Sequence, residues 1–336
     1  MKMTTGMRRR SFLAAGAGLA AGLAAALAIV AATSASAAYP ERTIRLIVPY
    51  PAGGSVDFIA RVMQPKLQEI LGQTVVIENR GGASGMIGSS AVAKAEPDGY
   101  TLLLGGVQTH AMNAAVIKTM MYDSLKDFTP IIETTAANWI LAANPKLGIK
   151  TPADLVKVAK AKPDGLTYAS SGKGSAAHLA FSLFASDLGI SIVHVPYKGI
   201  AQGITDTLGG QVSMVMGDTS TLLQHIQSGA LVAVAMTGNE RSPLLPNVPT
   251  IAETLIPGFD VRAWQGIWGP PGMSPELAKT INAAFQKVLS DPAVAERLKA
   301  GGVNPIGGSV EQFNKFTRSE FERWTATARK ANIVPE

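Results

Sequence analysis

The chain of 336 residues contains no cysteine and only four histidines. Without cysteine it can form no disulfide, thiolate zinc site, cysteine nucleophile or lipidated anchor. The histidines His110, His178, His194 and His225 never fall four residues apart, and no H-x-x-E-H or similar cluster is present. We therefore predict that the protein binds no metal.

Nucleotide and hydrolase motifs are also missing. Gly172-Lys173-Gly174 lacks the earlier glycine of a Walker A loop and has no hydroxyl directly after the lysine. The run 172–177 matches G-x-G-x-x-A, but the following strand ends in His194-Val195-Pro196, where a dinucleotide site needs an acid. No G-x-S-x-G elbow occurs. These absences predict a protein without a cofactor that is not an enzyme.

Residues 1–38 have the features of an export signal. A basic start precedes an alanine-, glycine- and leucine-rich run and then Ala35-Ser36-Ala37-Ala38, whose small residues suit signal peptidase. Arg9-Arg10 before Ser11-Phe12-Leu13 favours the twin-arginine route, although an arginine-rich start also serves general secretion. The apolar run approaches the length of a membrane span, so a retained anchor is the alternative to cleavage near Ala38. We expect a periplasmic protein.

Excess positive charge is absent once this leader is set aside. Four of the 30 basic residues lie in the leader, which leaves 26 basic against 24 acidic residues in the mature chain. Proteins that bind nucleic acid carry a basic footprint that neutralises phosphates. The balance therefore excludes nucleic acid as a partner.

What is present is an alternation of β-branched runs and amphipathic helices. Such alternation predicts an α/β fold in which mostly parallel sheets are flanked by helices. The expected strands are 43–49, 74–79, 100–104, 139–142, 166–170, 191–195, 212–216 and 231–236. The expected helices are 55–71, 86–95, 152–161, 175–188, 201–209, 219–228, 275–290, 292–300 and 309–330.

The order of these elements predicts two lobes. The C-terminal helices have no strands of their own to cover, so we expect them to pack on the first lobe. The chain then crosses between lobes near 139–143 and 259–266, which makes a hinge of two crossings over a cleft. Lobe 1 comprises 39–140 with 262–336, and lobe 2 comprises 141–261. Such hinges bind ligands by closing.

Two loops in this pattern predict anion binding. Ile44–Val48 breaks into Pro51-Ala52-Gly53-Gly54-Ser55, and Leu166–Ser170 breaks into Ser171-Gly172-Lys173-Gly174-Ser175, each before a helix. A helix start leaves backbone N–H groups unpaired and carries the positive end of the helix dipole, and glycine lets an anion approach the backbone. Each serine could equally cap its helix. Asp57, with Arg61 four residues on, fits a structural role better than ligand contact.

Short segments along the mature chain together resemble one family. They are Tyr39-Pro40, Ile44–Pro49, Pro51–Gly54 with Asp57 and Arg61, Val76–Arg80, Pro97–Leu102 and His194–Gly199. In order and spacing they are similar to the Bug-type substrate-binding proteins of tripartite tricarboxylate transporters. The resemblance covers essentially all of 39–336. It implies a type II-like periplasmic binding protein that closes over a small carboxylate and delivers it to membrane permease subunits.

The resemblance also implies where the ligand lies. One carboxylate is held between the loops around Gly53, Gly54 and Ser55 and around Ser171, Gly172, Gly174 and Ser175. Tyr50 replaces the commoner small residue and narrows the cleft. The far end of the ligand, a di- or tricarboxylate or an aromatic acid, is expected to meet Thr109, His110, Tyr197, Gly199, Asp218 and Trp264. We expect a monomer. A ligand-presenting partner of a two-component sensor and a periplasmic enzyme that acts on carboxylates remain as alternatives.

Overall fold

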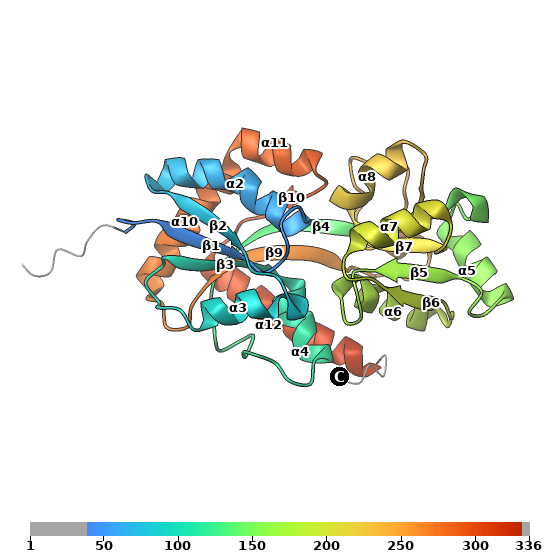
Figure 1. Ribbon diagram of the computed structural model, residues 1–336, viewed down its shortest axis with the longest axis horizontal. Coiled ribbons are helices and arrows are strands. Elements are labelled where there is room, and N and C mark those ends of the chain that lie inside the picture. The colour runs from blue at the N-terminus through green and yellow to red at the C-terminus, as the bar shows by residue number, and fades with distance from the viewer. Residues whose placement is uncertain (1–38, 331–336) are drawn as a thin grey trace, which may run out of the picture. The chain divides into compact units, whose positions relative to one another are not determined.

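The computed structural model describes residues 39–330, of which residues 42–330 lie in one compact unit (Figure 1). The predicted leader, 1–38, lies outside the described residues. Among those described, no helix is both long enough and apolar enough to cross a membrane.

The first series of elements follows the predicted alternation closely. Strand β1 is the middle of three parallel strands, with β2 on one side and β3 on the other. Its Ile44, Leu46, Ile47 and Val48 are at most 1% exposed, as expected for a parallel strand covered on both faces. In Figure 1, α2 lies above these strands and α3 below. The bounds are β1 Ile44–Val48, α2 Ser55–Leu71, β2 Val75–Asn79, α3 Met86–Ala93 and β3 Thr101–Gly106.

The second series repeats this arrangement. Strand β5 lies between β6 and β7 and is parallel to both. Figure 1 shows α7 and α8 above these strands and α6 below. The bounds are α5 Pro152–Ala161, β5 Thr167–Ser170, α6 Ala176–Leu188, β6 Val193–Pro196, α7 Ile200–Gly209, β7 Met214–Asp218, α8 Thr219–Gln227 and β8 Val232–Met236.

Two long strands join the series and run antiparallel to their neighbours. They are β4, Thr129–Ala143, and β9, Arg262–Gly269. β4 pairs with β9 up to Asn138 and with β7 and β8 beyond it, which gives the order β2-β1-β3-β9-β4-β7-β5-β6. The sheet is therefore mixed: its outer strands pair in parallel, as the predicted α/β fold requires, and the two central strands run antiparallel. The sequence indicated only the last part of β4, because pairing partners far along the chain, rather than a local pattern, extend a strand.

The two-lobe boundaries stay a prediction. The change of partner on β4 between Asn138 and Trp139 falls at the first predicted crossing, 139–143, and β9 begins within the second, 259–266.

The C-terminal helices pack against the first series. They are α10 Pro275–Ser290, α11 Pro292–Ala300 and α12 Val310–Lys330. Helices α10 and α11 pack on α2, and α12 packs along β4. Between α11 and α12 the short strand β10, Asn304–Pro305, adds to β4.

Several short helical segments were not expected from the sequence. After β3, a π-helical turn over Gln108–Met112 continues into α4, Asn113–Val116. Two 3-10 turns occupy Ala83–Gly85 and Pro145–Leu147, and α9 spans Ile251–Thr254. Such segments are too short to leave a periodic apolar pattern.

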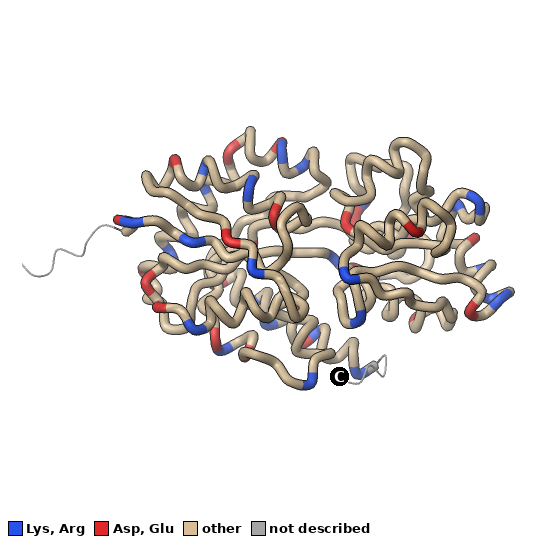
Figure 2. The backbone as a smooth tube through the Cα atoms, in the orientation of Figure 1, with Lys and Arg blue, Asp and Glu red and all other residues tan. Residues whose placement is uncertain are grey.

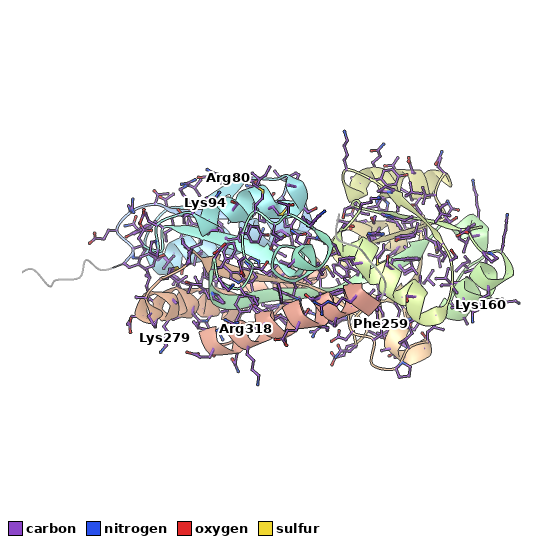
Figure 3. The ribbon with its side chains drawn as sticks, turned by 90° about the horizontal axis from the view of Figure 1, so that it is seen from below. Arg80, Lys94, Lys160, Phe259, Lys279 and Arg318 are labelled. Atoms are coloured by element: carbon purple, nitrogen blue, oxygen red, sulfur yellow. The ribbon has the colours of Figure 1, made fainter. Side chains whose placement is uncertain are left out.

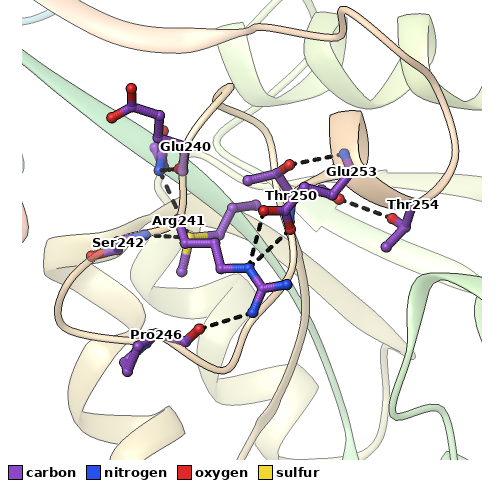
Figure 4. A network of polar contacts seen from close by, with 9 residues as sticks. Glu240, Arg241, Ser242, Pro246, Thr250, Glu253 and Thr254 are labelled. Atoms are coloured by element: carbon purple, nitrogen blue, oxygen red, sulfur yellow. Dashed lines mark hydrogen bonds and ion pairs between the residues drawn. The ribbon is translucent and has the colours of Figure 1, made fainter.

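The proline-rich segment before β9 is fixed by a polar network (Figure 4). Arg241 donates through Nε to both Glu253 carboxylate oxygens, at 3.1 and 2.9 Å, and through Nη1 to the Pro246 carbonyl at 3.0 Å. Thr250 and Glu253 form a capping box at the start of α9. The ion pair is exposed and contributes at most about 1 kcal/mol, so the cap and the backbone contact matter as much.

Candidate functional site

Both predicted anion loops lie at carboxyl ends of parallel strands. The first follows β1 and opens α2, and the second follows β5 and opens α6. In open α/β sheets ligands gather at this edge. The candidate site is built outward from these two loops.

The buried Asp57 carboxylate holds the first loop through hydrogen bonds. It is 3% exposed and accepts hydrogen bonds from Gly53 N at 2.9 Å, Arg61 Nε at 2.8 Å and Asn79 Nδ2 at 3.0 Å. Burial raises the pKa of Asp57, but the bonds from Arg61, Gly53 and Asn79 outweigh it and the pKa is lowered. The carboxylate therefore stays ionised and holds the loop, which matches the structural role favoured from the sequence.

The loop that Asp57 holds presents its backbone outward. Gly53 adopts φ +84°, a left-handed conformation that glycine accepts without strain. Gly54 is the N-cap of α2 and has no side chain to cover the helix start, and Ser55 is the first helical residue. Pro51, Ala52 and Gly53 are exposed. An anion could thus reach the N-terminal turn of α2.

In the second loop, hydroxyls and backbone already have partners. Ser175 Oγ caps α6 by accepting from His178 N at 3.3 Å and donates to Ser170 Oγ at 3.2 Å. Gly174 N donates to His178 Nδ1 at 3.1 Å, and Gly172 N donates to Ser170 Oγ at 3.2 Å. The loop is therefore preorganised, and Gly174 shapes it through φ +68°. Ser171, which is exposed, lies on its outer side.

Two stacked histidines support this loop, a pair that no sequence motif indicates. His178 and His194 have ring centroids 4.0 Å apart with a 12° angle between planes. His178 accepts from Gly174 at Nδ1, so its proton lies on Nε2, while His194 Nε2 bonds Ser170 Oγ at 2.7 Å. The pKa of His194 is lowered to about 4, mainly by burial and further by the charges of His178 and Lys173. An uncharged ring beneath the loop fits a supporting role; its one sequence signal is a histidine at the end of a strand.

Asp218 ends β7, which runs parallel to the strand that leads into the second loop. It is the N-cap of α8, yet its side chain makes no capping hydrogen bond. Burial raises the pKa of Asp218 to about 6, partly opposed by a hydrogen bond from Trp139. The pKa of Tyr50 is raised mainly by burial and to a lesser degree by the charges of Tyr122 and Asp218. Tyr50 of the first loop therefore lies within electrostatic range of Asp218.

Tyr197 and Gly199 follow β6 at the same edge. The Tyr197 hydroxyl donates to Asp206 Oδ2 at 2.6 Å, which fixes the ring against α7. Gly199 is the exposed N-cap of α7. Both residues are therefore brought to the edge that holds the second loop, Gly199 through its backbone.

The other predicted contacts, Thr109, His110 and Trp264, lie inside the protein. Thr109 Oγ1 bonds the backbone of Gly106 at 3.0 and 3.1 Å. His110 is fully buried and stacks on Trp268 with centroids 3.7 Å apart, and burial lowers its pKa to about 3. Trp264, 2% exposed, donates from Nε1 to Glu320 at 2.7 Å. Their contact with a ligand stays a prediction that needs the cleft to reach them.

The residue that connects the two sides of the site is Gln108, which sequence reasoning missed. Its Nε2 donates to the Gly174 carbonyl at 2.9 Å and to Asn113 Oδ1 at 2.5 Å. Asn113 Nδ2 in turn donates to the Ser84 carbonyl at 3.0 Å. The second loop is thus hydrogen-bonded to the turn after β3. The only feature of the sequence that points to Gln108 is the polar run directly after a buried strand.

Charge is mixed around the site. Figure 2 shows acidic and basic residues interspersed along the described chain, with no continuous band of one sign. Lys173 and Lys198 are exposed next to the second loop and the start of α7. Within residues 39–330, no three His, Asp or Glu side chains are grouped so that they could hold a metal ion.

This mixed sheet, with helix-opening loops at the ends of its parallel strands, is the fold of solved periplasmic binding proteins such as BugD, with a TM-score of 0.80 and 32% identity over 89% of this chain and 100% of its own. The family described as the tripartite tricarboxylate transporter family receptor matches residues 59–333, and the chain belongs to this family. Protein BugT of Bordetella pertussis is 36% identical over 90% of this chain and 93% of its own.

Solved structures agree with this assignment. Rpa4515 of R. palustris, solved with adipate, has a TM-score of 0.83 and 34% identity, covering 89% of this chain and 100% of its own. MatC of Rhodopseudomonas palustris, solved with bound malate, has a TM-score of 0.78 and 29% identity, covering 86% and 100%. Members of this family are binding receptors.

Proposed function

We propose that this protein is a periplasmic receptor that captures a small carboxylate between its two glycine-serine loops and delivers it to the membrane subunits of a tripartite transporter. The observation that carries the proposal is the hydrogen bond from Gln108 to Gly174, which ties the loop that opens α6 to the side of the sheet that carries the loop opening α2. The relatives solved with adipate and malate support a dicarboxylate as ligand.

Each part of the ligand has an assigned role in this proposal. One carboxylate meets the helix starts of α2 and α6, where backbone dipoles stabilise negative charge. The proposed contacts there are Gly53, Gly54, Ser55, Ser171, Gly172, Gly174 and Ser175. The far end meets Tyr50, Tyr197, Gly199 and Asp218 first, and Thr109, His110 and Trp264 if the cleft extends inward.

Asp218 bears on which ligands are accepted. A carboxylate at the end of the strand beside β5 repels a second ligand carboxylate unless one of the two is protonated. With its pKa raised to about 6, Asp218 can take up that proton and donate a hydrogen bond. We infer that a ligand hydroxyl, or a carboxylate sharing a proton with Asp218, occupies this position.

Calorimetric titration of the mature protein tests the proposal. Adipate, malate, citrate and benzoate are titrated, with adipamide as an uncharged analogue. We expect saturable binding of at least one acid and none of adipamide. Binding of no carboxylate, or of adipamide as well as adipate, would contradict the proposal.

A pair of variants localises the binding. Gly54→Val adds a branched side chain where the nearest atom to a new Cβ is the Pro51 carbonyl oxygen, 3.6 Å away, so the fold can accept it. The matched control Thr280→Val places the same side chain on the exposed part of α10. Gly54→Val should abolish binding of the acid and Thr280→Val should leave it unchanged. Equal affinities in the two variants would remove the first loop from the site.

A further inference from the structure

A pocket lies where β4 meets the segment before α12. It has a volume of about 360 Å³ and shares no residue with the carboxylate site. Its lining includes Glu133 of β4, Gly307, and Gln312, Phe313 and Phe316 of α12. Figure 3 shows α12, on which Arg318 is labelled, running along the sheet.

The walls of this pocket are held by hydrogen bonds. Gly307 N donates to the Glu133 carbonyl at 3.1 Å, and Gly308 N donates to Gln286 Oε1 at 3.2 Å. Asn282 Nδ2 donates to the Gly308 carbonyl at 2.9 Å. Phe313 packs against Gly266, where a Cβ would lie 2.2 Å from Phe313 Cζ. The cavity is thus a fixed feature of the fold.

Glu133 is the charged group of this pocket, and it lacks a counterion. Within residues 39–330 no hydrogen bond or ion pair holds its carboxylate. The charged groups that act on it are Arg262 of β9 and Glu320 of α12. Arg262 pairs with Asp260 at 3.0 Å, and Glu320 pairs with Arg323 at 2.8 Å. Burial raises the pKa of Glu133 to about 7, with Arg262 opposing and Glu320 adding to the rise.

Such a group gains from an external cation. An ionised carboxylate that is half-buried and without a partner, as Glu133 is, costs free energy, which a bound positive charge recovers. The neighbouring side chains Phe313 and Phe316 are apolar and can present π faces, which attract a cation. A metal ion would need several oxygen ligands, and the described residues hold no such group.

We propose that this pocket is a second binding site, which takes a small organic cation such as a primary alkylammonium. The ammonium pairs with Glu133 and its alkyl chain lies against Phe313 and Phe316. This inference does not depend on the carboxylate site. It gives the protein two ligands of opposite charge.

Titration of the mature protein with n-butylammonium chloride at pH 6 and pH 8 tests the proposal. With a pKa near 7, ionised Glu133 rises from about one tenth to nine tenths of the molecules over this range, so affinity should increase about tenfold. The ammonium itself stays charged at both values. Uncharged n-butanol should bind no better at pH 8 than at pH 6.

Two variants complete the test. Glu133→Gln keeps the shape and hydrogen-bonding capacity of the side chain and should abolish both the affinity and its pH dependence. Glu322→Gln, which removes an exposed acid of α12, should behave as wild type. A thermal unfolding midpoint close to wild type shows that Glu133→Gln is folded. The proposal is overturned if wild type does not bind the ammonium, or if Glu133→Gln binds it equally well.

Discussion

Loss of the Ser175 hydroxyl should separate two roles that one side chain combines. The hydroxyl caps α6 through His178 N and bonds Ser170 Oγ. Replacing a serine cap by alanine costs about 1 kcal/mol of helix or protein stability. For a protein of this size we expect Ser175→Ala to lower the unfolding midpoint by roughly 2–4 °C.

A matched serine cap lies far along the chain from the site. Ser274 caps α10 by accepting from Leu277 N at 3.1 Å. Ser274→Ala should therefore cost about the same stability as Ser175→Ala. The two variants can then be compared at equal loss of stability.

Ligand affinity should distinguish them. A hydrogen bond to a charged group contributes about 1.5–3 kcal/mol, and 1.4 kcal/mol is a factor of ten in affinity. If Ser175 bonds the ligand carboxylate, Ser175→Ala should bind every acid at least tenfold more weakly, while Ser274→Ala should bind as wild type.

Thermal unfolding without ligand and calorimetric titration with the acid that binds best provide both measurements. Wild-type affinity in Ser175→Ala would show that its hydroxyl only caps the helix. Equal loss of affinity in Ser274→Ala would show that the effect is one of global stability.

Four further outcomes are expected. Gln108→Met should lower stability by about 1–3 kcal/mol and weaken acid binding, because the Gly174 carbonyl loses its donor; unchanged affinity in titration would contradict the link between the two sides. Burial raises the pKa of Asp218 from 3.8 to about 6, so the folded state holds this proton more tightly and the free energy of unfolding falls as pH rises from about 4 to 6. Asp218→Asn should flatten that pH dependence in denaturant unfolding and be more stable than wild type above pH 6 by on the order of 2 kcal/mol. An unaltered pH dependence would refute this. Trp264→Phe removes the donor to buried Glu320 and should lower the unfolding free energy by about 1–3 kcal/mol, unlike a surface substitution. Saturating ligand should reduce the radius of gyration in small-angle scattering if the predicted hinge closes, whereas identical curves would indicate a rigid site.

The sequence by itself determined the local elements. The apolar stripe of α2, its glycine boundaries and the buried β-branched run of β1 are local patterns, and the predicted ranges 55–71 and 152–161 match α2 and α5 residue for residue. The positions of the two loops followed from the same local patterns, because a strand that ends in glycine and serine before a helix can be recognised from about ten consecutive residues. The ordered segments along the chain also indicated the family.

The tertiary structure alone decided which distant residues meet. The length of β4 depends on β9, more than a hundred residues away, and no local pattern distinguishes its first half from a loop. The burial of His110 against Trp268 and of Trp264 against Glu320 depends on packing between distant segments. Gln108 meets Gly174 because the two halves of the sheet are brought together, and His178 of α6 meets His194 of β6 through folding within the second series. The sequence fixes each side chain's chemistry, whereas burial and distance, which decide its charge state and its partner, exist only once the chain is folded.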